Sequence, residues 1–148
     1  GKLFGRSYGG LMDPYKCEDA EVIVVAMGGL ACGATRDAVD NMRSKGLRAG
    51  MLRLRSFRPF PNELIRKHLA KVKSVVVVER DFSYGNEGAV YTEVKGALYG
   101  LQPCPNVVNY IGGLAGADLV AQEIQDVAQK ALQTAGKVQT EIVFQYTE

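Results

Sequence analysis

"EVIVVAM" (Glu21–Met27) is a short run of apolar, largely β-branched residues, which is typical of a strand covered by helices on both faces. A glycine-rich turn follows it, and the next segment, "ATRDAVDNMRSKG", ends at Gly46, a residue type that commonly terminates helices. The apolar and small side chains of that segment share one helical face: Thr35, Ala38, Val39 and Met42. The stretch therefore predicts a strand, a turn and a helix, the unit from which parallel α/β sheets are built.

The same unit recurs three times further along the chain. Three more apolar runs predict strands: "RAGMLRLR" (Arg48–Arg55), "SVVVVER" (Ser74–Arg80) and "NVVNYI" (Asn106–Ile111). Each run precedes a segment with apolar residues at helical spacing, and Pro61 with Asn62 opens the first of these helices. Alternation of this kind requires right-handed crossovers. We therefore expect a three-layer α/β/α fold around a mostly parallel sheet of four to five strands.

The two ends of the chain lack this periodicity. Residues 1–20 contain several glycines and no repeating apolar pattern, so we expect an extended arm or linker. The α/β domain is expected to span residues 21–135. Residues 136–148 include "VQTEIVFQYTE", which predicts either a fifth strand on the sheet edge or a tail that docks elsewhere.

Composition narrows the class of protein. The chain has 148 residues, 47% of them apolar and 23% charged, with a net charge of +2, which is too small to indicate nucleic-acid binding. No segment approaches the roughly 20 apolar residues of a membrane span, so we expect a cytoplasmic protein without membrane contact. The cysteines stand singly and only one histidine is present, so we expect reduced thiols and no bound metal: Cys17, Cys32, Cys104 and His68.

The segment "RLRSFRPFP" (Arg53–Pro61) follows the second predicted strand. Ligands and partners of parallel sheets collect where strands end at their carboxyl side. Arginine side chains there suit carboxylates of a neighbouring domain or subunit. A second charged group ends the third predicted strand, and it predicts an ion-pair network at a domain contact more readily than an acid–base pair. The candidate interface residues are Arg53, Arg55, Arg58, Phe60, Glu79, Arg80 and Asp81.

The turn "MGGLACGAT" (Met27–Thr35) supports two interpretations. Backbone N–H groups at a helix start can bind an anion, which makes Gly28, Gly29, Gly33 and Thr35 a candidate anion turn. The turn is neither G-x-G-x-x-G nor a P-loop, however. The glycines can equally serve packing at a tight strand–helix junction, with Gly33 as a packing position. A nucleotide- or anion-binding module therefore stays open as the alternative function.

Several stretches together resemble a known family. They are "GRSYG" (Gly5–Gly9), "EDAEVIVVAMGG" (Glu18–Gly29), "GLRAGMLRLRSFRPFP" (Gly46–Pro61), "VVVVERDFSYGNEG" (Val75–Gly88) and "YIGGLAGAD" (Tyr110–Asp118). In this order they resemble the alpha subunits of 2-oxoacid:ferredoxin oxidoreductases, closest to those of pyruvate:ferredoxin oxidoreductases (pyruvate synthases). The matching part of that family is domain II, which is similar to the carboxyl-terminal domain of transketolase.

This resemblance implies the chemistry of a larger enzyme. Members oxidatively decarboxylate a 2-oxoacid to an acyl-coenzyme A and CO2, using thiamine diphosphate, Mg²⁺ and [4Fe–4S] clusters, and they reduce ferredoxin. Nothing in this chain resembles a thiamine-binding motif or a cluster-binding cysteine set. We therefore expect a structural and interface domain with no catalytic, cofactor-binding or metal-binding residues of its own. Its expected partners are the other domains or subunits of a homo- or hetero-oligomeric enzyme, with ferredoxin as partner of the whole.

Overall fold

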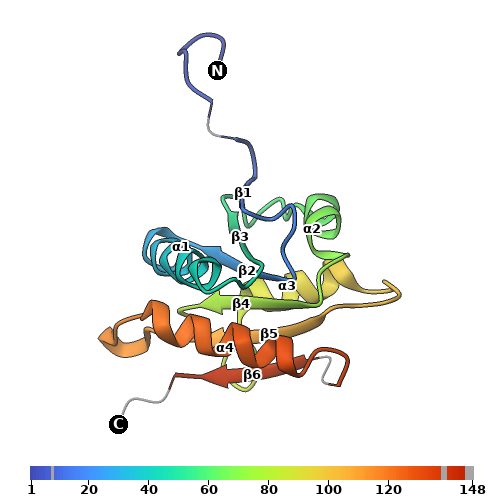
Figure 1. Cartoon of the computed structure of the whole chain (residues 1–148). Helices are drawn as coiled ribbons and strands as arrows, with labels where there is room; N and C mark the ends of the chain where they lie inside the picture. The colour runs from blue at the N-terminus through green and yellow to red at the C-terminus, as the bar shows by residue number, and fades with distance from the viewer. Residues whose placement is uncertain (8, 138–139, 146–148) are drawn as a thin grey trace.

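The computed structural model describes residues 1–7, 9–137 and 140–145 (Figure 1). In chain order the elements are β1 (Met12–Tyr15), β2 (Val22–Met27), α1 (Gly29–Ser44), β3 (Ala49–Leu54), α2 (Asn62–Leu69), β4 (Ser74–Glu79), α3 (Ala89–Leu98), β5 (Asn106–Ile111), the 3-10 helix η1 (Leu114–Gly116), α4 (Ala121–Gln133) and β6 (Thr140–Phe144). None of the described helices is long and apolar enough to cross a bilayer.

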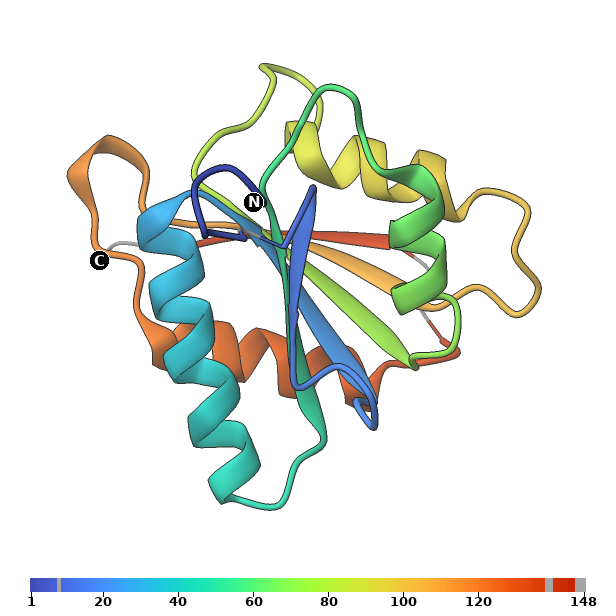
Figure 2. The same ribbon diagram turned by 90° about the horizontal axis from the view of Figure 1, so that it is seen from above.

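The strands form one sheet in the order β1-β3-β2-β4-β5-β6. Strands β3, β2, β4, β5 and β6 run parallel, whereas β1 pairs antiparallel with β3. Helices α1 and α4 cover one face of the sheet, and α2 and α3 cover the other (Figure 2). The predicted three-layer, mostly parallel architecture is confirmed, with six strands in place of the expected four or five.

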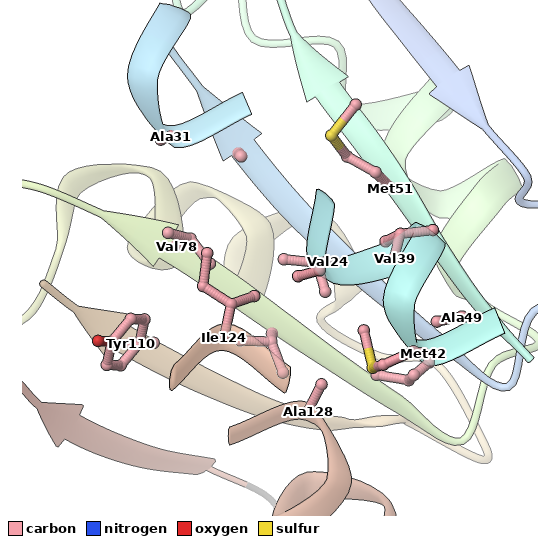
Figure 3. Close-up of a cluster of buried hydrophobic side chains, with 14 of the residues drawn as sticks. Val24, Ala31, Val39, Met42, Ala49, Met51, Val78, Tyr110, Ile124 and Ala128 are labelled. Atoms are coloured by element: carbon pink, nitrogen blue, oxygen red, sulfur yellow. The ribbon is translucent and has the colours of Figure 1, made fainter. Parts of the chain in front are cut away.

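The β-branched runs supply the two cores, one on each side of the sheet. Strand β4 is buried at every position, and along it Val76 and Val78 pack toward α1 and α4. Its alternate residues Val75 and Val77 pack toward α2 and α3. Figure 3 shows the first of these clusters, in which Met42 of α1 lies close to side chains of the sheet and α4. This alternation of sides explains why the strands are apolar throughout.

Strand β1 is the additional strand, and it lies in the segment expected to be an arm. It has four residues, one of them Pro14, and among the described strands it pairs with β3 alone. A short edge strand tolerates a proline and needs no apolar alternation, so local periodicity could not indicate it. Residues 1–7 extend away from the sheet (Figure 1).

At the other end of the chain, β6 occupies the edge position that was one of the two alternatives for residues 136–148. Residues 138–139 and 146–148 of that segment lie outside the described residues. The boundaries at residues 20 and 135 stay predictions.

The strand order creates a topological switch point. From β2 the chain leads through α1 to β3 on one side, and then crosses through α2 to β4 on the other side of β2. The two crossover helices lie on opposite faces, so the carboxyl ends of β2 and β4 border a crevice. In open α/β sheets this is the position where ligands or partners usually bind.

Candidate functional site

A cavity of about 250 Å³ lies at this crevice, which we call the switch-point cavity. The turn after β2 contributes Gly28 and Gly29, and the end of β4 contributes Glu79, Arg80 and Asp81. The fold thus brings part of the candidate anion turn and part of the candidate interface set to the same place.

Glu79 is the most constrained side chain of this cavity. Only 4% of its surface is exposed, and its carboxylate accepts the N–H groups of Val90 (2.6 Å) and Tyr91 (3.1 Å) in the first turn of α3. The side-chain amide of Asn109 donates a third hydrogen bond at 3.0 Å. Burial raises the pKa of Glu79 to about 7, against the opposing effect of these donors. The carboxylate therefore fastens α3 to β4 and β5.

Gly88 makes room for this carboxylate. A Cβ atom at residue 88 would lie 1.8 Å from Oε2 of Glu79 and 2.9 Å from Oδ1 of Asn109. The backbone N–H of Gly88 itself donates to that Asn109 oxygen at 2.9 Å. Gly88 and Asn109 could not be identified from the sequence, because their roles depend on a contact between β4, β5 and the start of α3 that no local pattern contains.

Arg80 and Asp81 directly follow Glu79 at the end of β4, but both residues are exposed. The Arg80 guanidinium donates through Nε and Nη2 to the carbonyl of Gly113, at 3.1 and 2.9 Å, although the residue is exposed. It therefore ties the end of β4 to the loop after β5. The negative charge of Asp81 helps to raise the pKa of Glu79, because it disfavours a second negative charge nearby.

Two arginines of "RLRSFRPFP" have partners within the chain. Arg55 pairs with Asp13 of β1 at 3.0 Å, and Arg58 pairs with Glu93 of α3 at 2.7 Å. The Arg58 guanidinium also lies 4.2 Å from the centre of the Phe57 ring, and its side chain is 62% exposed. The half-buried Phe60 packs edge-to-face on Phe57 with ring centres 6.3 Å apart. These contacts hold the loop in a defined position at the carboxyl edge.

Arg53 lies in a second cavity, of about 220 Å³, between β1, β3 and the start of α1. We call it the β3–α1 cavity. Gly29, Gly33 and Arg36 of α1 also line it. The interpretation of Gly33 as a packing position is wrong, because Gly33 is exposed and a Cβ atom there would meet nothing within 4 Å.

The residues of the candidate anion turn therefore lie in three different places. Gly28 has a φ of 89°, a backbone conformation that favours glycine, and it lines the switch-point cavity. Gly33 lines the β3–α1 cavity. Thr35 is fully buried in α1, and its hydroxyl has no partner among the described residues. The four residues do not converge on one point.

Large apolar side chains are exposed at the same carboxyl edge. They lie at the ends of β2 and β6, at the starts of α1 and α4, and in the loop after β4: Met27, Phe144, Leu30, Val120 and Tyr84. We call these the carboxyl-edge apolar residues. Phe82 links two of them, with its ring centre 5.5 Å from that of Tyr84 and 5.6 Å from that of Phe144. Exposed apolar groups beside charged ones are typical of protein–protein contacts.

The described residues do not fit an iron–sulfur cluster. Within residues 1–7, 9–137 and 140–145, no three His, Cys, Asp or Glu side chains gather as metal ligands would. Burial raises the pKa of the Cys17 thiol to about 11, which favours the protonated form over the thiolate that binds metal. Cys32 is buried and Cys104 is exposed on a different part of the chain. His68 is half-buried on α2, where burial and Lys67 lower its pKa.

Known proteins with similar sequences indicate the family of this chain. Residues 20–124 match the family model described as pyruvate:ferredoxin oxidoreductase core domain II. The chain is 41% identical over 135 residues to pyruvate synthase subunit PorA of Methanosarcina barkeri, covering 90% of this chain and 33% of that protein. It is 38% identical over 144 residues to ketoisovalerate oxidoreductase subunit VorA of Pyrococcus horikoshii, covering 96% and 36%. The chain thus spans about a third of the length of these relatives.

Solved structures agree in fold. A 2-oxoglutarate:ferredoxin oxidoreductase from Magnetococcus marinus, with 2-oxoglutarate, coenzyme A and succinyl-CoA bound, matches with a TM-score of 0.61 and 19% identity, over 89% of this chain and 21% of that one. A split-gene transketolase, in an inactive beta4 tetramer, matches with a TM-score of 0.66 and 22% identity, over 88% and 45%. The transketolase-like fold expected from the resemblance is confirmed. From the match over residues 20–124, the chain belongs to the pyruvate:ferredoxin oxidoreductase core domain II family.

Proposed function

We propose that this chain is domain II of the alpha subunit of a 2-oxoacid:ferredoxin oxidoreductase. The whole enzyme would oxidatively decarboxylate a 2-oxoacid to its acyl-coenzyme A and CO2, passing the electrons to ferredoxin. The names of the two relatives, one a pyruvate synthase subunit and one a ketoisovalerate oxidoreductase subunit, support the substrate class. We favour pyruvate, in accord with the sequence resemblance, and a cytoplasmic location.

Within that enzyme, we assign this domain to assembly. The observation that carries this assignment is the set of carboxyl-edge apolar residues, exposed beside the charged ends of β3 and β4. Burying such residues against another domain or subunit would contribute free energy in proportion to the apolar area removed from water. Arg58, whose side chain is 62% exposed, borders this area, where it would meet a carboxylate of the partner.

The buried carboxylate of the switch-point cavity, that of Glu79, favours this role over catalysis, and the other carboxylate there, that of Asp81, is exposed to solvent. A general base needs a carboxylate that can reach substrate, but the Glu79 oxygens are occupied by two backbone N–H groups and an amide. A Mg²⁺ ion holding a diphosphate would need free oxygen ligands, which a carboxylate committed in this way does not offer. By the resemblance, thiamine diphosphate, Mg²⁺ and the [4Fe–4S] clusters would be bound elsewhere in the assembly, and coenzyme A would be a substrate there.

Two exposed tyrosines allow a matched test. Tyr84 is 96% exposed at the carboxyl edge, and Tyr99 is 86% exposed after α3, at the opposite edge of the sheet. Each would be changed to serine in the complete oxidoreductase, and assembly would be followed by size-exclusion chromatography together with activity per assembled particle. We expect Tyr84→Ser to weaken assembly, Tyr99→Ser to leave it unchanged, and both to keep normal activity per particle. Normal assembly of Tyr84→Ser with reduced activity per particle would contradict the proposal.

A further inference from the structure

Most of the described arginines donate a hydrogen bond to an acceptor in the described part of the chain. Six of them do so: Arg43, Arg48, Arg55, Arg58, Arg66 and Arg80. Outside residues 1–7, the described arginines for which no such acceptor exists are Arg36 and Arg53. Both line the β3–α1 cavity. Two guanidinium groups with no hydrogen-bond acceptor among the described residues thus lie around one space.

The residues that line this cavity carry two guanidinium groups and one carboxylate. Asp40 also interacts with Arg36 from outside the lining, but it is already paired with Lys16 at 2.6 Å. Arg53 comes from β3, and Arg36 comes from α1, where its guanidinium lies 4.2 Å from the centre of the Tyr15 ring. The one carboxylate that lines the cavity belongs to Asp13, which is already paired with Arg55. Two guanidinium groups around a shared space repel each other, and an anion between them would remove that repulsion.

The glycines of α1 keep the cavity open. Neither Gly29 nor Gly33 has a positive φ, and a Cβ atom at either would meet nothing within 4 Å. Glycine inside a helix costs about 1 kcal/mol relative to alanine, so neither the backbone nor internal packing accounts for Gly33, which lies inside α1. Its absent side chain instead leaves the helix backbone accessible next to both arginines.

We propose that the β3–α1 cavity binds the phosphoryl group of a phosphate monoester. A carboxylate offers two coplanar oxygens, which satisfy one arginine fork, whereas a phosphoryl group presents three oxygens that can be shared between forks on two elements. The volume of about 220 Å³ is below the roughly 300–1,000 Å³ of sites that enclose a whole small molecule. The rest of the ligand therefore extends into solvent. This proposal does not depend on the assembly role proposed above.

The test is a titration of the ¹⁵N-labelled 148-residue chain with inorganic phosphate at pH 7 and constant ionic strength, followed by NMR. We expect saturable shifts of the Gly29 and Gly33 amides, with none at Gly96, which lies on the exposed side of α3. Acetate at the same concentrations should give no saturable shift. Shifts that grow linearly, or that acetate reproduces, would overturn the proposal.

Three variants locate the site. Arg53→Met should weaken phosphate binding about tenfold or more, the loss expected for one charge-assisted contact. Arg6→Met removes the same charge from an exposed residue of the amino-terminal arm, and it should leave the affinity unchanged. Gly33→Ala should raise the melting temperature and still weaken binding, which separates occupation of the cavity from loss of the fold. Equal effects of Arg53→Met and Arg6→Met would reduce the binding to general electrostatic attraction and refute the site.

Discussion

Replacing Gly88 by alanine tests the buried contact that fixes α3. The Gly88 backbone, with φ −65° and ψ 146°, suits any residue, so the cost of the change is steric. The new Cβ would lie 1.8 Å from Oε2 and 2.4 Å from Cδ of Glu79, far inside van der Waals contact. The carboxylate must therefore move away from the N–H groups of Val90 and Tyr91.

The magnitude follows from two costs. Overpacking of a core typically costs about 1–3 kcal/mol. A buried donor that loses its acceptor costs a further 1–3 kcal/mol or so. We expect Gly88→Ala to lower the free energy of unfolding by about 2–6 kcal/mol, a large fraction of the roughly 5–15 kcal/mol of a typical domain.

Urea denaturation of the chain, followed by circular dichroism, measures this loss. Gly96→Ala is the matched control, because Gly96 is an exposed residue of α3 whose Cβ would meet nothing within 4 Å; it should gain about 0.5–1 kcal/mol. In a Glu79→Ala background the clash with the carboxylate is removed and only the approach to Oδ1 of Asn109 at 2.9 Å remains, so Gly88→Ala should then cost clearly less. Similar stabilities of the two single glycine variants, or an undiminished cost in the Glu79→Ala background, would refute the reasoning.

Three further predictions concern charge and cofactors. Because the pKa of Glu79 is raised from 4.5 to about 7, the folded state holds its proton longer than the unfolded state, so stability should fall as pH rises from about 4.5 to 7. This fall in the free energy of unfolding is at most on the order of 3 kcal/mol, and it should be absent in Glu79→Gln. If the unfolding free energies of the wild type and Glu79→Gln change with pH in the same way, the prediction is contradicted. Arg58→Ala should cost the isolated chain under about 1 kcal/mol in urea denaturation, since its pair with Glu93 is largely exposed, yet weaken assembly of the complete enzyme in size-exclusion chromatography; intact assembly would count against an interface role. Calorimetry with thiamine diphosphate and iron analysis of anaerobically purified chain should both be negative, and micromolar binding or cluster absorbance would contradict the assembly role.

The sequence predicted the elements that local periodicity defines. Runs such as Val75–Val78 are apolar because helices cover both of their faces, and each run is followed by a helix with its own apolar stripe. Strand β1 was missed, since a short edge strand containing Pro14 needs no such pattern.

The candidate site was predictable in position but not in detail. The carboxyl edge follows from the parallel sheet, and Glu79, Arg53 and Gly29 do lie there. The partners of these residues come from distant segments, as with Asn109 beside Glu79, and only the strand order brings them together. Gly33 was misjudged for the same reason, because its open surroundings depend on the position of β3 relative to α1.

Hydrogen–deuterium exchange of the complete oxidoreductase, compared with the isolated chain, tests the assembly role most directly. The backbone amides of Asp81–Tyr84 lie in the loop after β4, next to the carboxyl-edge apolar residues. Those of Gly100–Cys104 lie in the loop before β5, at the opposite edge, and serve as the internal control. We predict that exchange slows at Asp81–Tyr84 in the complete enzyme and stays unchanged at Gly100–Cys104. Equal exchange at Asp81–Tyr84 in the isolated chain and the complete enzyme would mean that this edge faces solvent in the assembly, and it would contradict the proposed role.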